Sequence, residues 1–286
     1  MVNAFPITEE VRHLILIVGS GFLSFVIAFL AANPFINFLR KHKLGKNIRE
    51  IASDGKSAPL FHALHNKKAG TPTMGGILIW GSALITILLS RVFSYIGWFD
   101  HSLINRKETY LAIFTLISVA LLGMVDDLFN IKGWGRSKGL NIKPKFFWLV
   151  MFALAGALWF HFKLGYDQIH IPGVGDFMIG AWYIPLFMFI IAGSANAVNI
   201  TDGLDGLSGG LIVIAFGAYA GIAYAHGLFI LAAFCAVIAG SSLAFLWFNI
   251  APARFYMGDT GSISLGATLG VIAMLTNTVL ILPFIA

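Results

Sequence analysis

Residues 196–210 read Asn196-Ala197-Val198-Asn199-Ile200-Thr201-Asp202-Gly203-Leu204-Asp205-Gly206-Leu207-Ser208-Gly209-Gly210 and join two strongly apolar segments. Carboxylates and carboxamides therefore lie where hydrocarbon gives way to water. If Asn199, Asp202 and Asp205 share a helical turn, their spacing of three spreads them over only about 120° of its circumference. An isolated Asp-Gly pair is typical of a cap and turn, but two pairs flanked by Asn favour a functional site. Converging oxygens of this kind suit Mg²⁺.

The composition excludes an ordinary soluble domain. Hydrophobic residues make up 58% of the 286 residues and charged residues only 11%, whereas soluble domains carry about 25% charged residues. The sequence predicts an all-α, polytopic transmembrane helix bundle, because apolar runs long enough to cross about 30 Å of hydrocarbon recur along it. Eight such runs are Leu14 to Leu39, Ile77 to Tyr95, Tyr110 to Val125, Phe146 to His161, Trp182 to Val198, Leu211 to Ala225, Leu228 to Phe248 and Ile263 to Ala286.

The cations are unevenly distributed between the loops. Eight Lys and Arg residues lie between residues 40 and 68, and five lie between 132 and 145. The positive-inside rule assigns these two loops to the cytoplasmic side. We therefore expect a multi-pass membrane protein with its N-terminus outside. The basic loops also suit anionic lipid or a phosphate substrate, and we expect no nucleic-acid partner.

Alternation of eight spans gathers the connections after spans one, three, five and seven on the cytoplasmic face. Those connections gather Asp126, Asp127, Asp202, Asp205 and Asp259, and only Glu50 and Asp54 join them on that side. The adjacent pair Asp126-Asp127 follows a span and opposes the dipole of its helix, so a metal ion or a lysine such as Lys143 is needed to relieve it. Asp259 alone could be a helix N-cap. Acids clustered with lysines at a bilayer boundary predict metal-assisted phosphoryl transfer between a soluble and a lipid phosphate.

Two further features of the sequence are a short strand-and-turn segment and a single cysteine. Gln168-Ile169-His170-Ile171 followed by Pro172-Gly173 predicts a small external β-hairpin. The lone Cys235 lies in an apolar run, which excludes an intramolecular disulfide.

Several separated motifs resemble those of one enzyme family. They are Gly70 to Gly76, the Asp126-Asp127 pair, Gly139-Leu140 followed by Lys143, Asn196 to Leu207, and Asn249 through Pro252 to Met257-Gly258-Asp259. At these residues the chain resembles the polyprenyl-phosphate N-acetylhexosamine-1-phosphate transferases over essentially its whole length. Thr71-Pro72-Thr73-Met74-Gly75-Gly76 after a basic run resembles their muramoyl-pentapeptide branch.

The resemblance implies a reaction and its partners. Phospho-N-acetylmuramoyl-pentapeptide is transferred from its UDP carrier (UDP-MurNAc-pentapeptide) to undecaprenyl phosphate, which releases UMP, forms lipid I of peptidoglycan synthesis and uses Mg²⁺. It also implies a homodimer in the bacterial inner membrane with a cytoplasmic active site. The alternative within the family is transfer of N-acetylglucosamine-1-phosphate from UDP-N-acetylglucosamine. A membrane transporter is a remote alternative, because transporters place coupling carboxylates near the bilayer midplane whereas every Asp here lies at a span end or in a loop.

The resemblance also implies roles for individual residues. Asp259 matches the principal metal ligand, with Asn199 as a further metal ligand, and Asp126 and Asp127 match the pair that engages the lipid phosphate. Asn199, Asp202 and Asp205 match the loop that orients the nucleotide. Lys143 matches a catalytic position and Asn249 a substrate-binding one, while Lys68 and Thr73 belong to the first-loop motif.

The chain departs from the family pattern at two places. Asn130 stands where a basic residue usually follows the Asp pair, and Lys132 could replace it. The family has about ten spans and a histidine-rich motif in its last cytoplasmic loop. We therefore expect residues 1–286 to be a single integral membrane transferase domain that lacks the family's C-terminal spans.

Overall fold

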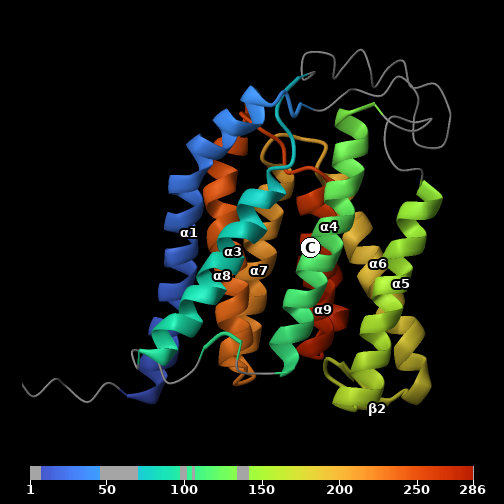
Figure 1. The fold of residues 1–286 in the computed structure, drawn as a ribbon. Helices are drawn as coiled ribbons and strands as arrows, with labels where there is room; N and C mark the ends of the chain where they lie inside the picture. The colour runs from blue at the N-terminus through green and yellow to red at the C-terminus, as the bar shows by residue number, and fades with distance from the viewer. Residues whose placement is uncertain (1–7, 46–69, 97–101, 105–106, 134–141, 286) are drawn as a thin grey trace, which may run out of the picture.

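The computed structural model describes residues 8–45, 70–96, 102–104, 107–133 and 142–285. Long helices lie side by side in a bundle (Figure 1). They are α1 (Glu9–Lys41), α3 (Gly76–Tyr95), α4 (Lys107–Ile131), α5 (Ile142–Leu158), α6 (Tyr183–Thr201), α7 (Leu207–Ala225), α8 (Phe229–Asn249) and α9 (Asp259–Leu275). Short helical pieces are η2 (Trp159–Leu164), which is π-helical and continues α5, η3 (Gly180–Trp182), η4 (Val279–Ile281) and α10 (Leu282–Ile285).

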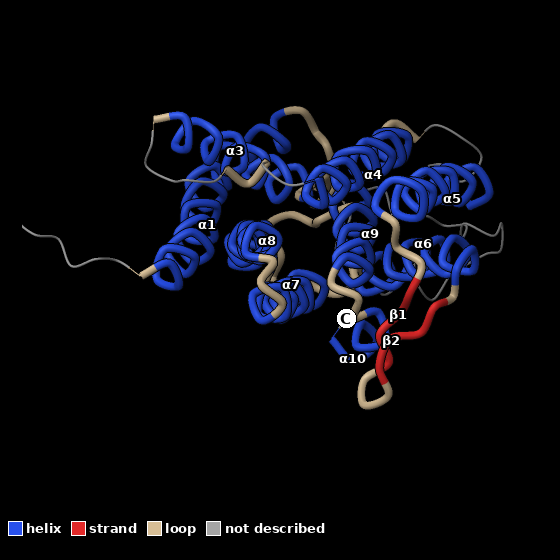
Figure 2. The backbone as a smooth tube through the Cα atoms, turned by 90° about the horizontal axis from the view of Figure 1, so that it is seen from below, coloured by secondary structure: helices blue, strands red, loops and turns tan. Residues whose placement is uncertain are grey.

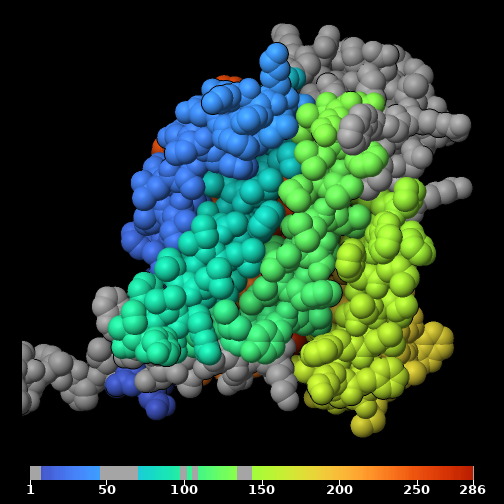
Figure 3. Space-filling model, in the orientation of Figure 1, coloured from blue at the N-terminus to red at the C-terminus, as the bar shows by residue number. Residues whose placement is uncertain are grey.

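The bundle has the surface of a membrane protein. Within the described residues, seven helices are long and apolar enough to cross a bilayer. Their outward faces expose large apolar side chains, including Phe22, Leu30, Leu88, Phe189 and Ile214. Figure 3 shows the continuous face that α1, α3, α4 and α5 build together. Such a surface suits lipid rather than water, and the predicted multi-pass helical fold is confirmed.

Helix α9 forms the centre of one half of the bundle. Every residue from Thr260 to Leu275 is buried, and α9 packs along α4 and α6. Figure 2 shows it enclosed by its neighbours. Small residues allow this packing, since a methyl group on Gly266 would overlap the backbone of Ser194 in α6. In the other half, α8 packs against α1 and α7.

The last predicted span differs from the structure. The apolar run Ile263 to Ala286 was expected to be one helix, but α9 begins at Asp259 and ends at Leu275. Asn277 takes a left-handed conformation with φ 53°, after which the chain continues as η4 and α10. A left-handed residue cannot continue an α-helix, and hydropathy alone does not reveal this break.

The predicted β-hairpin is confirmed. Strands β1 (Gln168–Ile171) and β2 (Gly175–Met178) pair antiparallel, with Gln168 opposite Met178. The hairpin lies at the C-terminal end of α9, because the His170 N–H donates to the Asn277 side-chain oxygen over 3.0 Å. Asp259 begins the same helix about 25 Å away at 1.5 Å per residue. The hairpin and the predicted acidic site therefore lie at opposite ends of the bundle.

Candidate active site

The segment that joins α8 to α9, residues 250–258, runs against the segment that precedes α3. The Tyr256 N–H donates to Pro72 O, and the Gly75 and Gly76 N–H groups donate to Tyr256 O and Met257 O, each over 2.8 Å. Gly76 lies so close to Gly261 that a methyl group on it would overlap the α9 backbone. The first and last predicted motifs thus form one structural unit.

Asp127 binds the N-terminus of α9 from the neighbouring helix α4. Its two oxygens accept the N–H groups of Asp259 and Thr260 at 3.1 Å and 3.0 Å. Gly258, the N-cap of α9, has no side chain to do this. Asp127 therefore satisfies two donors that a helix start leaves open, and its charge lies at the favourable end of the α9 dipole.

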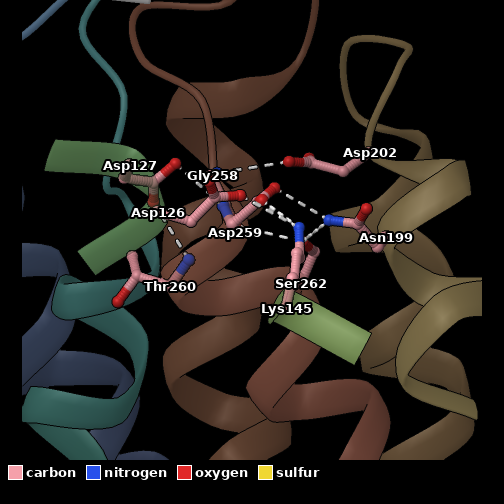
Figure 4. Close-up of polar contacts among 9 residues, drawn as sticks. All are labelled: Asp126, Asp127, Lys145, Asn199, Asp202, Gly258, Asp259, Thr260 and Ser262. Atoms are coloured by element: carbon pink, nitrogen blue, oxygen red, sulfur yellow. Dashed lines mark hydrogen bonds and ion pairs between the residues drawn. The ribbon is translucent and has the colours of Figure 1, made fainter. Parts of the chain in front are cut away.

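Lys145 lies between two carboxylates from different helices (Figure 4). Its ammonium group is 3.1 Å from Asp126 Oδ2 and also forms an ion pair with Asp259 Oδ2. Asp126 is only 2% exposed, and a buried carboxylate needs such a partner. The ion pairs join α4, α5 and α9 at one point.

Asn199 holds Asp259 from the side of α6. Its side-chain nitrogen donates to Asp259 Oδ1 over 2.9 Å and to the Ser262 hydroxyl over 2.8 Å. The Ser262 hydroxyl in turn donates to Gly258 O over 3.1 Å. Asp259 is thus oriented by Lys145 through one oxygen and by Asn199 through the other.

Asn199, Asp202 and Asp205 do not share one helical turn. Helix α6 ends at Thr201, and Gly206 has φ 78°, so the residues between them form a turn instead. Each acid contacts a different part of segment 250–258: Asp202 Oδ2 accepts the Gly258 N–H, and Asp205 Oδ2 accepts the Ala253 N–H, both over 3.2 Å. Asp202 and Asp205 are thus directed at this segment, whereas Asn199 contacts Asp259 and Ser262 in α9, so the three side chains do not meet at a single point.

Asn249, predicted to bind substrate, is 2% exposed and connects two loops. Its oxygen accepts the Gly206 N–H over 3.0 Å, and its nitrogen donates to Phe255 O over 2.9 Å. In this arrangement both of its polar atoms are engaged within the protein. Its contribution to substrate binding remains a prediction.

Of the two first-loop residues predicted to bind substrate, the structure describes Thr73 but not Lys68. Thr73 is buried, and its N–H donates to Leu44 O over 3.0 Å. Its hydroxyl has no hydrogen-bond partner among the described residues and lies beside Gly258. Lys68 falls outside the described residues.

Lys145 is the described lysine that contacts the acidic pair, through Asp126. Lys143, which the sequence suggested for this role, also belongs to α5, but its side chain lies outside the described part of the structure. The catalytic role of Lys143 therefore remains a prediction. The acidic pair itself lies inside α4, which continues to Ile131 rather than ending at Val125.

The arrangement fits a divalent cation at one place. Asp126 and Asp259 share the Lys145 ammonium, whereas Asp127, Asp202 and Asp205 accept backbone N–H groups. Among the described residues, no group of three or more His, Cys, Asp or Glu side chains could hold a metal ion. Two carboxylates that already surround one cation nevertheless suit Mg²⁺, which takes one or two carboxylates and completes its shell with phosphates and water.

Comparison with known proteins assigns the family. Residues 109–277 match glycosyl transferase family 4, and residues 68–79 match phospho-N-acetylmuramoyl-pentapeptide-transferase signature 1. A phospho-N-acetylmuramoyl-pentapeptide-transferase of Geobacillus sp. (strain WCH70) is 39% identical over 92% of this chain and 76% of its own length. The protein of that name from Chloroflexus aurantiacus is 37% identical over 100% of this chain and 73% of its own length. The chain belongs to the phospho-N-acetylmuramoyl-pentapeptide-transferase family.

The two family matches meet at the site described above. Thr73 lies within residues 68–79, and the acids, Lys145 and Asn199 lie within residues 109–277. Backbone hydrogen bonds from Gly75 and Gly76 join the two regions beside Asp259. The family assignment confirms the predicted resemblance and favours an enzyme over a transporter.

Proposed function

We propose that this protein transfers phospho-N-acetylmuramoyl-pentapeptide from its UDP carrier to undecaprenyl phosphate and forms lipid I of peptidoglycan synthesis. An oxygen of the lipid phosphate attacks the phosphorus that carries the sugar, and the anhydride bond to UMP breaks. The main support for this proposal is the match to proteins named phospho-N-acetylmuramoyl-pentapeptide-transferase, at 35% to 39% identity over most of the chain. Their signature segment packs directly on the segment that leads to Asp259.

The residues divide into two sides around Asp259. On the α4 side, Asp126, Asp127 and Lys145 lie where we propose that the lipid phosphate is engaged. On the α6 side, Asn199 and Asp202 lie where we propose that the nucleotide is oriented. A lipid phosphate is already ionised near neutral pH, so fixed placement and charge matter more here than proton removal.

Asp259 is the residue proposed to hold Mg²⁺, together with Asn199. Mg²⁺ when bound neutralises charge on the diphosphate and the leaving UMP. Asp126 lies close enough to contribute to the same site, because it and Asp259 both pair with the Lys145 ammonium group. The Asn199 amide nitrogen faces Asp259 in this structure, so a metal bond from Asn199 requires its amide oxygen to turn inward.

We further propose that the carboxylate end of the bundle faces the cytoplasm of a bacterial inner membrane, with the N-terminus outside. The exposed cations Arg40, Lys41 and Lys43 lie at the end of α1 that reaches this site, and cytoplasmic loops are rich in such residues. We also propose that the chain forms a single membrane domain and assembles as a homodimer.

An assay with two donors tests the reaction. Purified protein is incubated with undecaprenyl phosphate, Mg²⁺ and either UDP-MurNAc-pentapeptide or UDP-N-acetylglucosamine, and UMP release and the lipid product are measured. We expect UMP only with the muramoyl donor, loss of turnover on chelation and recovery with Mg²⁺. UMP from the N-acetylglucosamine donor alone supports the alternative transferase, and UMP from neither donor contradicts both.

A further inference from the structure

Tyr256 connects three separate parts of the site. Its backbone pairs with Pro72 and Gly75 in the first-loop segment, as described above. Its hydroxyl donates to Asp205 Oδ1 over 3.3 Å, across the α6–α7 turn. Tyr256 also lies only three residues before Asp259 in the chain.

The carboxylate of Asp205 is directed toward the same segment through both oxygens. Oδ1 accepts the Tyr256 hydroxyl, and Oδ2 accepts the Ala253 N–H. The turn is also held at its ends, because Asp202 accepts the Gly258 N–H and the Gly206 N–H donates to Asn249. The donors to Asp202 and to Oδ2 of Asp205 are backbone N–H groups. The Tyr256 hydroxyl is a side-chain donor, which Tyr256→Phe removes without changing the ring.

The phenol remains a donor under physiological conditions. Burial, and then the neighbouring charge of Asp205, raise the pKa of Tyr256 well above its ordinary value. Tyrosine already ionises only near pH 10. A neutral phenol beside a carboxylate makes a hydrogen bond to a charged acceptor, which is stronger than one between neutral groups.

We propose that the Tyr256 hydroxyl is a positioning group. By its hydrogen bond to Asp205 it holds the 202–206 turn in place beside Gly258 and Asp259, and it thereby sets the affinity for the nucleotide donor. The inference rests on the proposed function. The turn lies on the α6 side of Asp259, whereas Asp126, Asp127 and Lys145 approach Asp259 from α4 and α5. Loss of the hydroxyl therefore affects the donor and leaves the lipid substrate unaffected.

The test measures steady-state kinetics of Tyr256→Phe, Asp205→Asn and the double variant, with both substrates varied in turn. Removing one hydrogen bond to a charged group predicts an increase of about tenfold in KM for the UDP donor. We expect kcat and the KM for undecaprenyl phosphate to stay within about twofold. Asp205→Asn has the same effect, because an amide offers one acceptor where the carboxylate offers two.

The double variant separates positioning from independent roles. If the two groups act through their mutual bond, the double variant is no worse than the poorer single variant. Increases in KM that multiply contradict the proposal. Tyr95→Phe is the matched control, since Tyr95 is 92% exposed at the far end of α3 and its variant keeps wild-type kinetics.

Thermal unfolding distinguishes positioning from a purely structural role. A lower unfolding midpoint with an unchanged KM for the donor means that the hydroxyl only stabilises the fold, and it overturns the proposal. If the wild type is active and Tyr256→Phe has an unchanged KM for the UDP donor, this inference is refuted and the proposed function still stands. A wild type that releases no UMP from the muramoyl donor refutes the proposed function, and the inference with it.

Discussion

At the scale of single residues, Asp259 is the side chain on which the site depends. One oxygen meets Lys145 and the other meets Asn199. Asp259→Asn keeps the shape of the side chain and removes its charge, so we expect the protein to fold and UMP release to fall by about 100-fold or more. Turnover at saturating Mg²⁺ is the measurement.

The matched control for this change is Asp176→Asn. Asp176 is an exposed carboxylate in the hairpin at the opposite end of the bundle, where it pairs with His170. That variant should retain full turnover. Normal UMP release by Asp259→Asn would show that Asp259 is not a metal ligand of the reaction.

The two lysines of α5 give a second residue-scale prediction. The sequence favoured Lys143, whereas the structure places Lys145 between Asp126 and Asp259. Lys145→Ala leaves two carboxylates without their shared cation, so we expect at least a 100-fold loss of turnover. Lys143→Ala in the same assay tests the sequence-based choice, and a larger loss of turnover in Lys143→Ala than in Lys145→Ala would favour Lys143.

Sequence reasoning located the acids of the site better than their partners. Asp126, Asp127, Asp202, Asp205 and Asp259 were placed together because span alternation requires it. Their individual contacts depend on which face of a helix each residue takes and on where a helix ends. Asp205, for example, bonds Tyr256 because α6 stops at Thr201, and neither an apolar pattern nor a motif encodes this.

At the scale of helices, the site depends on how closely α4 approaches the start of α9. A methyl group on Gly123 would overlap the carbonyl of Asp259, which is backbone and cannot rotate away. Gly123→Ala should therefore separate Asp127 from the Asp259 and Thr260 N–H groups. We expect a loss of stability of about 1–3 kcal/mol and a marked loss of turnover, measured by thermal unfolding and UMP release.

Gly81→Ala in α3 is the control for this prediction. A methyl group there meets no atom within 4 Å, and Ala favours helix over Gly. Its stability should be unchanged or slightly higher. Wild-type stability and turnover in Gly123→Ala would contradict the close approach of α4 to α9.

The helices were largely predictable because lipid-facing segments must be long and apolar. The hairpin was predictable from its turn residues. The end of α9 was not, because the polar residues Thr276 and Asn277 stand within a longer apolar run that continues to Ala286. Thr276 bonds back to Ile272 O, whereas Asn277 takes left-handed backbone and accepts the His170 N–H from the hairpin, a tertiary contact that only the folded chain specifies.

At the scale of the whole molecule, the two ends of the bundle should lie on opposite sides of the membrane. Cys235 is fully buried, so single added cysteines can be labelled without background. A membrane-impermeant maleimide should label Val174→Cys in the hairpin from outside intact cells. Lys41→Cys, at the site end of α1, should react only after the cells are made permeable.

Equal labelling of both positions in intact cells would contradict a bundle that spans the bilayer. The opposite pattern would mean that the chain inserts with the carboxylate end outside, against the positive-inside rule. The alternation of spans was sufficient to predict that the site lies at one end. Which compartment that end faces is decided by charge rather than by packing.

The complete enclosure of α9 has a consequence for biosynthesis. The helices that surround it, among them α4 and α6, precede it in the chain and leave the ribosome first. Lys145 and the α4 acids must therefore remain in a partly assembled bundle until α9 brings Asp259 and Thr260 to them. These side chains should therefore come together around Asp259 in one step, only after translation has passed Leu275.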